Sequence, residues 1–199
     1  NFAHDQTILC TYAYPVDSEK QKLRSKMRAN RSAIQHEVPD WALLLESSEF
    51  RNAHTIASYI SYGDEPSTQT LNFELLKRDK NLLLPRLLPD RNLEWVPWDG
   101  RDDSLSQPIG SGYREPIGNT YDGEIDLLII PALAVDMNGN RLGQGGGSYD
   151  RALETLQSWK VALIYDDELL DTDIPVELHD QRVNAAVTPV RLVRFSEKG

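Results

Sequence analysis

Glycine and arginine residues give the strongest chemical signal in this sequence, in the segment Asp136–Asp150 (DMNGNRLGQGGGSYD). The segment follows an apolar strand that is predicted to end at Pro131, and it leads into a predicted helix. Bare backbone N–H groups at a helix N-terminus bind anions, and Arg141 adds a cation. A flexible turn is the alternative, although so many glycines are costly in backbone entropy. We therefore predict a phosphate site formed by Gly143, Gly145, Gly146 and Gly147.

The type of phosphate cannot be identified from this segment alone. The Walker A pattern GxxxxGK[ST] occurs nowhere in the sequence. The dinucleotide fingerprint GxGxxG also fails, because Ser148 stands where the third glycine is required.

A second signal is a run of six cations without an acid between Lys20 and Arg31. On a helix, four of them fall within about 80° of one another: Lys20, Arg24, Arg28 and Arg31. An apolar stripe lies about 90° away, which places the cations at the edge of the buried face. The stripe consists of Leu23, Met27 and Ile34. The row is either a solvated helix face or a phosphate-binding helix that acts together with the glycine segment.

Three carboxylates have positions that suit site chemistry. Asp150 lies in the first turn of the helix after the glycine segment, where it either caps the helix or holds Mg²⁺ against phosphates. Glu65 and Asp180 lie in loops, and each either contacts a ligand or lines a solvated turn. The acidic run 166–173 is expected to be a solvated loop, and the four histidines show no metal-ligand spacing. No Ser-His-Asp, Cys-His or GxSxG arrangement supports nucleophilic catalysis.

Composition bounds the class of protein. The 199 residues (22.6 kDa) suit one α/β domain, and we assign 1–16 to an arm and 17–199 to a single domain. A net charge of −10 argues against nucleic acid or an anionic membrane as the main partner, and no apolar run approaches the ~20 residues that span a bilayer. The single cysteine, Cys10, excludes a disulfide framework, so a reducing compartment, the cytoplasm, is the expected location.

Predicted strands and helices alternate along the chain, which is typical of an open, mostly parallel sheet with helices on both faces, a Rossmann-like three-layer α/β fold. Ligands bind such sheets at the carboxyl ends of the strands, here after 54–61, 81–84 and 125–130. Helices are expected from the capping box Ser18–Gln21 to about Gln35, from Pro39 to about Phe50, and over 70–79 and 148–159. Strands are expected at 54–61, 81–85, 93–98, 125–130, 161–165, 185–188 and 190–195, with a loop over 99–124.

Four segments in a fixed order make the chain similar to the 5-formyltetrahydrofolate cyclo-ligase (methenyltetrahydrofolate synthetase) family over about 20–190. They are KQKLR at Lys20–Arg24 with Arg31, SYISYGDEPST at Ser58–Thr68, IIPALAVDMNGNRLGQGGGSYDR at Ile129–Arg151, and PVELHD at Pro175–Asp180. The third segment is long and specific, whereas the first and last are weak alone. The resemblance implies an ATP- and Mg²⁺-dependent ligase that forms 5,10-methenyltetrahydrofolate, ADP and phosphate. The formyl oxygen would attack the γ-phosphate, and a neighbouring amine would then close the ring.

The resemblance also implies roles for individual residues, among which Arg141 and Tyr149 would be catalytic. It assigns ATP to Lys20, Gln21, Lys22, Leu23, Arg24, Arg141, Leu142, Gly143, Gln144, Gly145, Gly146, Gly147, Ser148 and Tyr149. It assigns the folate to Ile60, Glu65, Tyr113, Gln144, Gly145, Gly146, Gly147 and Ser148. It assigns Mg²⁺ to Asp150 and Asp180. The expected oligomeric state is a monomer or weak dimer.

The chain departs from the family pattern at Ser148, where an aromatic residue usually precedes the tyrosine. The missing ring is worth on the order of 1 kcal/mol of contact with a folate. Two other functions therefore stay open. One is a folate- or nucleotide-binding protein without turnover. The other is a sugar-phosphate isomerase-like enzyme, which would need no ATP, although the basic helix argues against it.

Overall fold

The computed structural model describes residues 15–34 and 37–196, so nearly all of the predicted arm lies outside the described residues. A seven-stranded sheet in the order β12-β11-β9-β6-β1-β2-β3 forms the core. Its strands are β1 Thr55–Ala57, β2 Asn81–Leu87, β3 Leu93–Pro97, β6 Leu127–Pro131, β9 Trp159–Leu163, β11 Ala185–Val187 and β12 Leu192–Arg194. The five inner strands are parallel to one another, and each of the two edge strands is antiparallel to the strand beside it.

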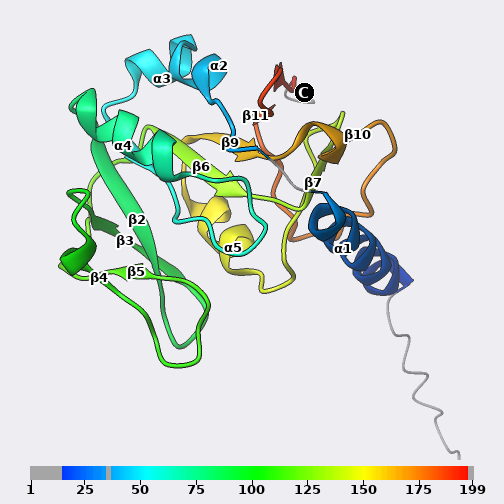
Figure 1. The fold of residues 1–199 in the computed structure, drawn as a ribbon. Coiled ribbons are helices and arrows are strands. Elements are labelled where there is room, and N and C mark those ends of the chain that lie inside the picture. The colour runs from blue at the N-terminus through cyan, green and yellow to red at the C-terminus, as the bar shows by residue number, and fades with distance from the viewer. Residues whose placement is uncertain (1–14, 35–36, 197–199) are drawn as a thin grey trace, which may run out of the picture.

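Helices cover both faces of this sheet (Figure 1), as the alternation of elements predicts. Four consecutive residues of β6, 127–130, are fully buried, because a parallel strand inside the sheet is covered from both sides. Ile129 packs in a cluster with residues of α2, α3 and α4, whereas Ile130 packs with Leu153 of α5. The helices are α2 Ala42–Leu45, α3 Ser48–Asn52, α4 Gln69–Lys77 and α5 Ser148–Thr155. The predicted open α/β fold is therefore confirmed.

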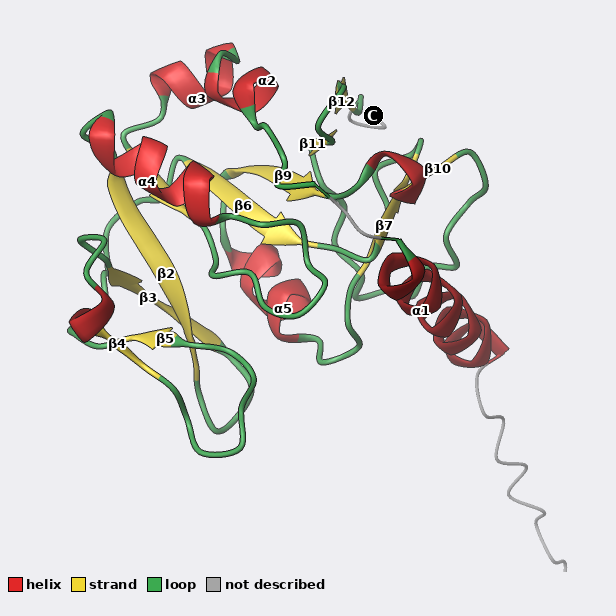
Figure 2. Cartoon of the chain, in the orientation of Figure 1, coloured by secondary structure: helices red, strands yellow, loops and turns green. Residues whose placement is uncertain are grey.

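The first helix, α1 (Pro15–Ala33), packs against a second, smaller sheet at one end of the large one (Figure 2). Met27 of α1 is buried against Leu133, Leu142 and Ile174. The small sheet has the order β10-β7-β8, with β10 at Leu169–Leu170, β7 at Ala134–Asp136 and β8 at Arg141–Leu142. The sequence analysis did not predict this small sheet, against which α1 packs beside the glycine segment.

Several predicted boundaries are wrong. The helix α1 begins at Pro15, so Ser18 lies inside it and is not its N-cap. The helix expected from Pro39 is two short helices, because Ser47 caps the second by accepting from the Phe50 N–H at 3.2 Å. The helix expected over 148–159 ends at Thr155.

Shorter elements also differ from the prediction. The strand expected over 54–61 is limited to 55–57, which leaves the following residues free to line a cavity. The predicted loop over 99–124 contains a 3₁₀ turn at Asp102–Ser104 and a small two-stranded sheet, β4 (Leu105–Ser106) with β5 (Glu115–Pro116). No helix in the described ranges is both long and apolar enough to cross a membrane.

A buried ion pair attaches α1 to the rest of the fold. Arg31 donates from Nε and Nη2 to the two carboxylate oxygens of Glu168, each at 2.6 Å, and from Nη2 to the Ala132 carbonyl at 2.7 Å. Both side chains are almost fully buried. The prediction that 166–173 is a solvated loop is therefore wrong at Glu168, and Arg31 anchors the helix instead of facing a phosphate site. Ile34, expected on the apolar stripe, is half exposed.

Candidate active site

Two adjoining cavities lie at the carboxyl edge of the large sheet, where the topology predicts a site. The first, of about 220 Å³, is formed by the residues after β1, the end of β6, parts of β2 and β3, and the glycine segment. The second, of about 210 Å³, lies between α1, the glycine segment and the loop 177–180. The glycine segment forms the wall between the two, because both cavities are lined by Arg141, Gly143, Gly145, Gly147 and Asp150.

The sequence suggested that the glycine segment runs directly from the large sheet into the helix, but it does not. The strands β7 and β8 intervene, and the turn follows Leu142. Gly145 and Gly147 have φ values of +99° and +70°, a left-handed region that favours glycine. Gly147 is also the N-cap of α5, so the turn exposes backbone at a helix N-terminus.

Cations from α1 meet this turn, as the paired sequence signals predict. Arg24 donates from Nε to the Gly143 carbonyl at 3.1 Å. Arg28 donates to the Gln144 backbone carbonyl at 2.9 Å and to its side-chain oxygen at 3.1 Å. The row of cations therefore divides into two parts: Lys20, Arg24 and Arg28 lie at the cavity or its turn, while Arg31 lies buried in the anchor.

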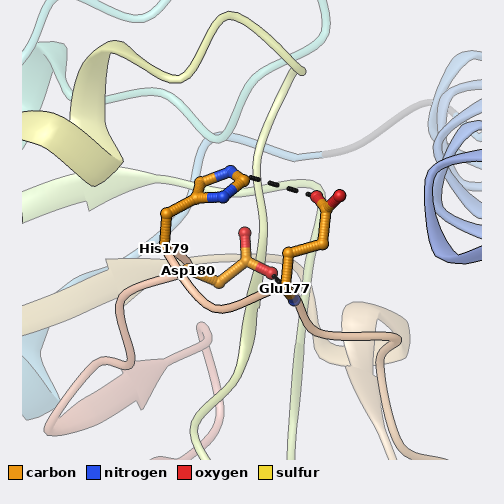
Figure 3. Close-up of side chains that lie close together, drawn as sticks. All are labelled: Glu177, His179 and Asp180. Carbon is orange, nitrogen blue, oxygen red and sulfur yellow. Dashed lines mark hydrogen bonds and ion pairs between the residues drawn. The ribbon is translucent and has the colours of Figure 1, made fainter. Parts of the chain in front are cut away.

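A cluster of polar side chains closes the second cavity on the side of the loop 177–180. The Lys20 ammonium contacts Glu177 at 3.0 Å and also Asp180, and only 3% of the lysine side chain is exposed. Figure 3 shows Glu177, His179 and Asp180 directed toward one another. One ligand atom from each of the three lies within 4.8 Å of the others. The loop thus brings His179 close to two carboxylates, although the spacing of the histidines in the sequence gives no metal-ligand signal.

Arg141 lies between the two cavities. Its Nη2 donates to Asp150 at 2.8 Å, its Nη1 donates to the Pro131 carbonyl at 3.3 Å, and its guanidinium lies over the Tyr149 ring at 5.9 Å. The Nε atom is buried and has no hydrogen-bond partner in the part of the chain that the structure describes. Asp150 thus pairs with an arginine and does not cap α5. Burial raises the pKa of the Tyr149 hydroxyl, which stays protonated at neutral pH.

The first cavity is lined by several tyrosines and by the carboxyl group of Glu65. The rings of Tyr62 and Tyr113 are 6.0 Å apart and tilted by 56°. Glu65 accepts from the Tyr62 N–H at 3.2 Å. Burial raises the pKa of Glu65 to about 7, although this hydrogen bond and the nearby Arg31 and Gln144 act in the opposite direction. A flat ligand with polar edges therefore suits this cavity.

Most of the predicted site residues line one of the two cavities. Ile60, Glu65, Tyr113 and the segment 141–150 do so, as do Lys20, Arg24 and Asp180. Gln21 and Lys22 are exposed and Leu23 packs in the apolar cluster below α1; none of these three lines either cavity. The sequence analysis missed Tyr59, Tyr62, Glu177 and His179, although all four lie inside the segments that carried the resemblance.

The open parallel sheet, with two adjoining cavities at its carboxyl edge, defines an α/β protein with two candidate ligand sites. Residues 16–189 match the sequence profile of the 5-formyltetrahydrofolate cyclo-ligase family. The chain belongs to this family of ligases.

Individual relatives agree with this assignment. The chain is 32% identical to a 5-formyltetrahydrofolate cyclo-ligase of Mycolicibacterium smegmatis, over 86% of this chain and 94% of that one. It is 34% identical to a 5-formyltetrahydrofolate cyclo-ligase of Escherichia coli, over 70% and 80%. Its fold is similar to the solution structure of 5,10-methenyltetrahydrofolate synthetase of Aquifex aeolicus, with a TM-score of 0.77, 26% identity, and 90% and 94% of the two chains covered.

Proposed function

We propose that this protein uses ATP to convert 5-formyltetrahydrofolate into 5,10-methenyltetrahydrofolate, with release of ADP and phosphate. The observation that carries this proposal is the shared wall of the two cavities. A polyphosphate in the cationic cavity and a flat substrate in the aromatic cavity would meet over the turn Gly143–Gly147. Direct phosphoryl transfer between bound substrates requires such contact and little further chemistry from the protein.

The second cavity is proposed to bind the ATP phosphates. Lys20, Arg24 and Arg141 bring positive charge, and the backbone of the glycine turn brings N–H donors at the N-terminus of α5. Asp150 and Asp180 both line this cavity, and Mg²⁺ is commonly bound by one or two carboxylates together with substrate phosphates. The donor set therefore fits the ion, which would neutralise charge on the phosphates.

The first cavity is proposed to bind the folate. Tyr113 and Ile60 offer apolar contacts, and Glu65 is placed to accept hydrogen bonds from the N–H donors on the polar edge of a pterin. Ser148 lines this cavity as the first residue of α5, where relatives of the family usually have a ring.

The proposed reaction requires two bond-forming steps. The formyl oxygen attacks the γ-phosphorus, and the bond to the β-phosphate oxygen breaks, so that ADP leaves. The neighbouring amine then attacks the activated carbon and loses its proton, and the carbon–oxygen bond breaks to release phosphate. Arg141 lies between the cavities, where its guanidinium would stabilise charge on the transferring group.

A coupled assay tests this function. Purified protein with 5-formyltetrahydrofolate, ATP and Mg²⁺ is expected to develop the near-ultraviolet absorbance of the methenyl product and to release ADP in equal amount. Tight binding of the folate without ADP release would contradict the proposed reaction and favour a binding protein. Turnover of a sugar phosphate without ATP would favour a sugar-phosphate isomerase-like enzyme.

The raised pKa of Glu65 predicts a pH dependence. The ionised carboxylate accepts hydrogen bonds from pterin N–H groups with both oxygens and more strongly than the protonated carboxyl, so kcat/KM for the folate is expected to rise with pH and to level off above about 7. The effect on stability has the opposite sign. Because folding raises this pKa, the carboxyl reduces the free energy of unfolding as the pH rises from about 4.5 to about 7.

Glu65→Gln provides the control for the pH dependence, since its amide does not titrate. The variant is expected to lower kcat/KM for the folate and to remove the rise near neutral pH, with the ATP dependence unchanged. A variant that keeps the wild-type pH profile would rule out Glu65 as its origin.

Further properties belong to the same proposal. The net charge of −10 supports a protein without nucleic acid or membrane partners. We also propose a single domain over 17–199, a cytoplasmic location, and a monomer or weak dimer.

A further inference from the structure

The second cavity already contains its own counter-ions. Lys20 is paired with Glu177 and Asp180, and Arg141 is paired with Asp150. The charged residues of the cavity are three cations and three carboxylates, with His179 beside them. A triphosphate that takes either cation for itself therefore leaves a carboxylate without its partner. Partly buried carboxylates without a counter-ion are costly, so a further cation must enter with the phosphates.

The position of the entering cation follows from the side chains around Lys20. Its ammonium contacts two carboxylates that come from one short loop. His179 belongs to the same loop, and its Nε2 lies 3.9 Å from Glu177 Oε2 (Figure 3). The loop is held in this shape by the Glu177 N–H, which donates to Asp180 at 2.5 Å. Two oxygen ligands and one imidazole nitrogen within 4.8 Å of one another suit a divalent metal ion.

We propose that Lys20 and a divalent cation are alternative partners of Glu177, His179 and Asp180. The lysine holds the carboxylates together until phosphates draw it toward the glycine turn, and the metal ion then replaces the ammonium. Glu177 and His179 thereby join Asp180 as metal ligands. The identity of the phosphate ligand rests on the function proposed above, whereas the exchange between lysine and metal does not.

Removing the ammonium tests the exchange directly. Lys20→Met is expected to bind Mn²⁺ about tenfold more tightly than the wild-type protein, without nucleotide, because a repelling charge has left the ligands. The Mn²⁺ titration is followed by electron paramagnetic resonance of the free ion. The matched control is Lys26→Met, an exposed lysine of the same helix that lines neither cavity. Circular dichroism checks folding, and Lys20→Gln replaces the methionine variant if it does not fold.

Two second-site variants test the ligands. In the Lys20→Met background, Glu177→Gln and His179→Asn are each expected to lose about tenfold in Mn²⁺ affinity. Equal Mn²⁺ affinity for Lys20→Met and Lys26→Met would overturn the exchange. Unchanged Mn²⁺ affinity in the double variants would overturn the ligand assignment.

Calorimetry with a non-hydrolysable ATP analogue separates this inference from the proposed function. The wild-type protein is expected to bind the analogue about tenfold more tightly with Mn²⁺ than without it, and His179→Asn is expected to reduce that gain. A protein that binds no analogue, yet gains Mn²⁺ affinity in Lys20→Met, contradicts the proposed function and supports the exchange. An equal gain in wild type and His179→Asn contradicts His179 as a ligand.

Discussion

Arg31→Met is expected to lower the free energy of unfolding by about 3–5 kcal/mol, because removing one partner of a buried ion pair leaves the other charge uncompensated. Glu168 is only 2% exposed, and both of its carboxylate oxygens accept hydrogen bonds from Arg31. Burial disfavours the charge on Arg31, but Glu168 outweighs this effect and raises the pKa of the guanidinium above its usual value. Urea denaturation measures the change.

The control for this variant is an exposed pair of the same type. Arg194 donates to Glu49 at 2.7 and 2.9 Å, and its side chain is about half exposed. Arg194→Met is expected to cost no more than about 1 kcal/mol. Equal losses for the two variants would contradict the anchoring role of Arg31. The double variant Arg31→Met with Glu168→Met is expected to recover most of the loss, since apolar replacements of a buried pair are often tolerated.

Arg141→Ala is expected to lower kcat/KM for ATP by about 10²–10³, the usual consequence of losing a donor that stabilises developing charge. Its side chain is 3% exposed and lies between the two cavities. The loss also leaves Asp150 without its partner, which adds a negative charge beside the phosphates. Steady-state kinetics with varied ATP measure the effect.

Folate binding provides the first control for Arg141→Ala, because the folate contacts proposed above come mainly from 60–65 and 113. Its affinity is expected to change only a few-fold. Arg191→Ala, which removes an exposed pair with Asp166, is expected to leave both substrates unaffected. A normal KM and kcat for ATP in Arg141→Ala would remove this residue from the phosphate site.

The meeting of α1 with the glycine turn could be predicted from the sequence, because each partner carries a strong signal. The closely spaced glycines indicate an anion-binding site, and so does the run of cations without an acid. One polyphosphate accounts for both signals. The contacts of Arg24 and Arg28 with the turn agree with that prediction. The central strand was equally clear, since a continuous apolar run such as 127–130 is typical of an inner parallel strand.

Other features had no local signal. Arg31 belongs to the same helical row as Arg24, and only the position of Glu168, 137 residues later, turns it into an anchor. The strands β8 and β10 are two residues long, too short to show a period. His179 comes close to Glu177 and Asp180 through the shape of one loop, which the spacing of the residues alone does not reveal.

The proposed function depends on direct contact between ATP and the folate over the glycine turn. Substrate labelled with oxygen-18 in its formyl group tests this most directly, with mass spectrometry of the released phosphate. Each labelled oxygen is expected to leave on inorganic phosphate, together with one methenyl product. Unlabelled phosphate, with the label recovered in water, would contradict it.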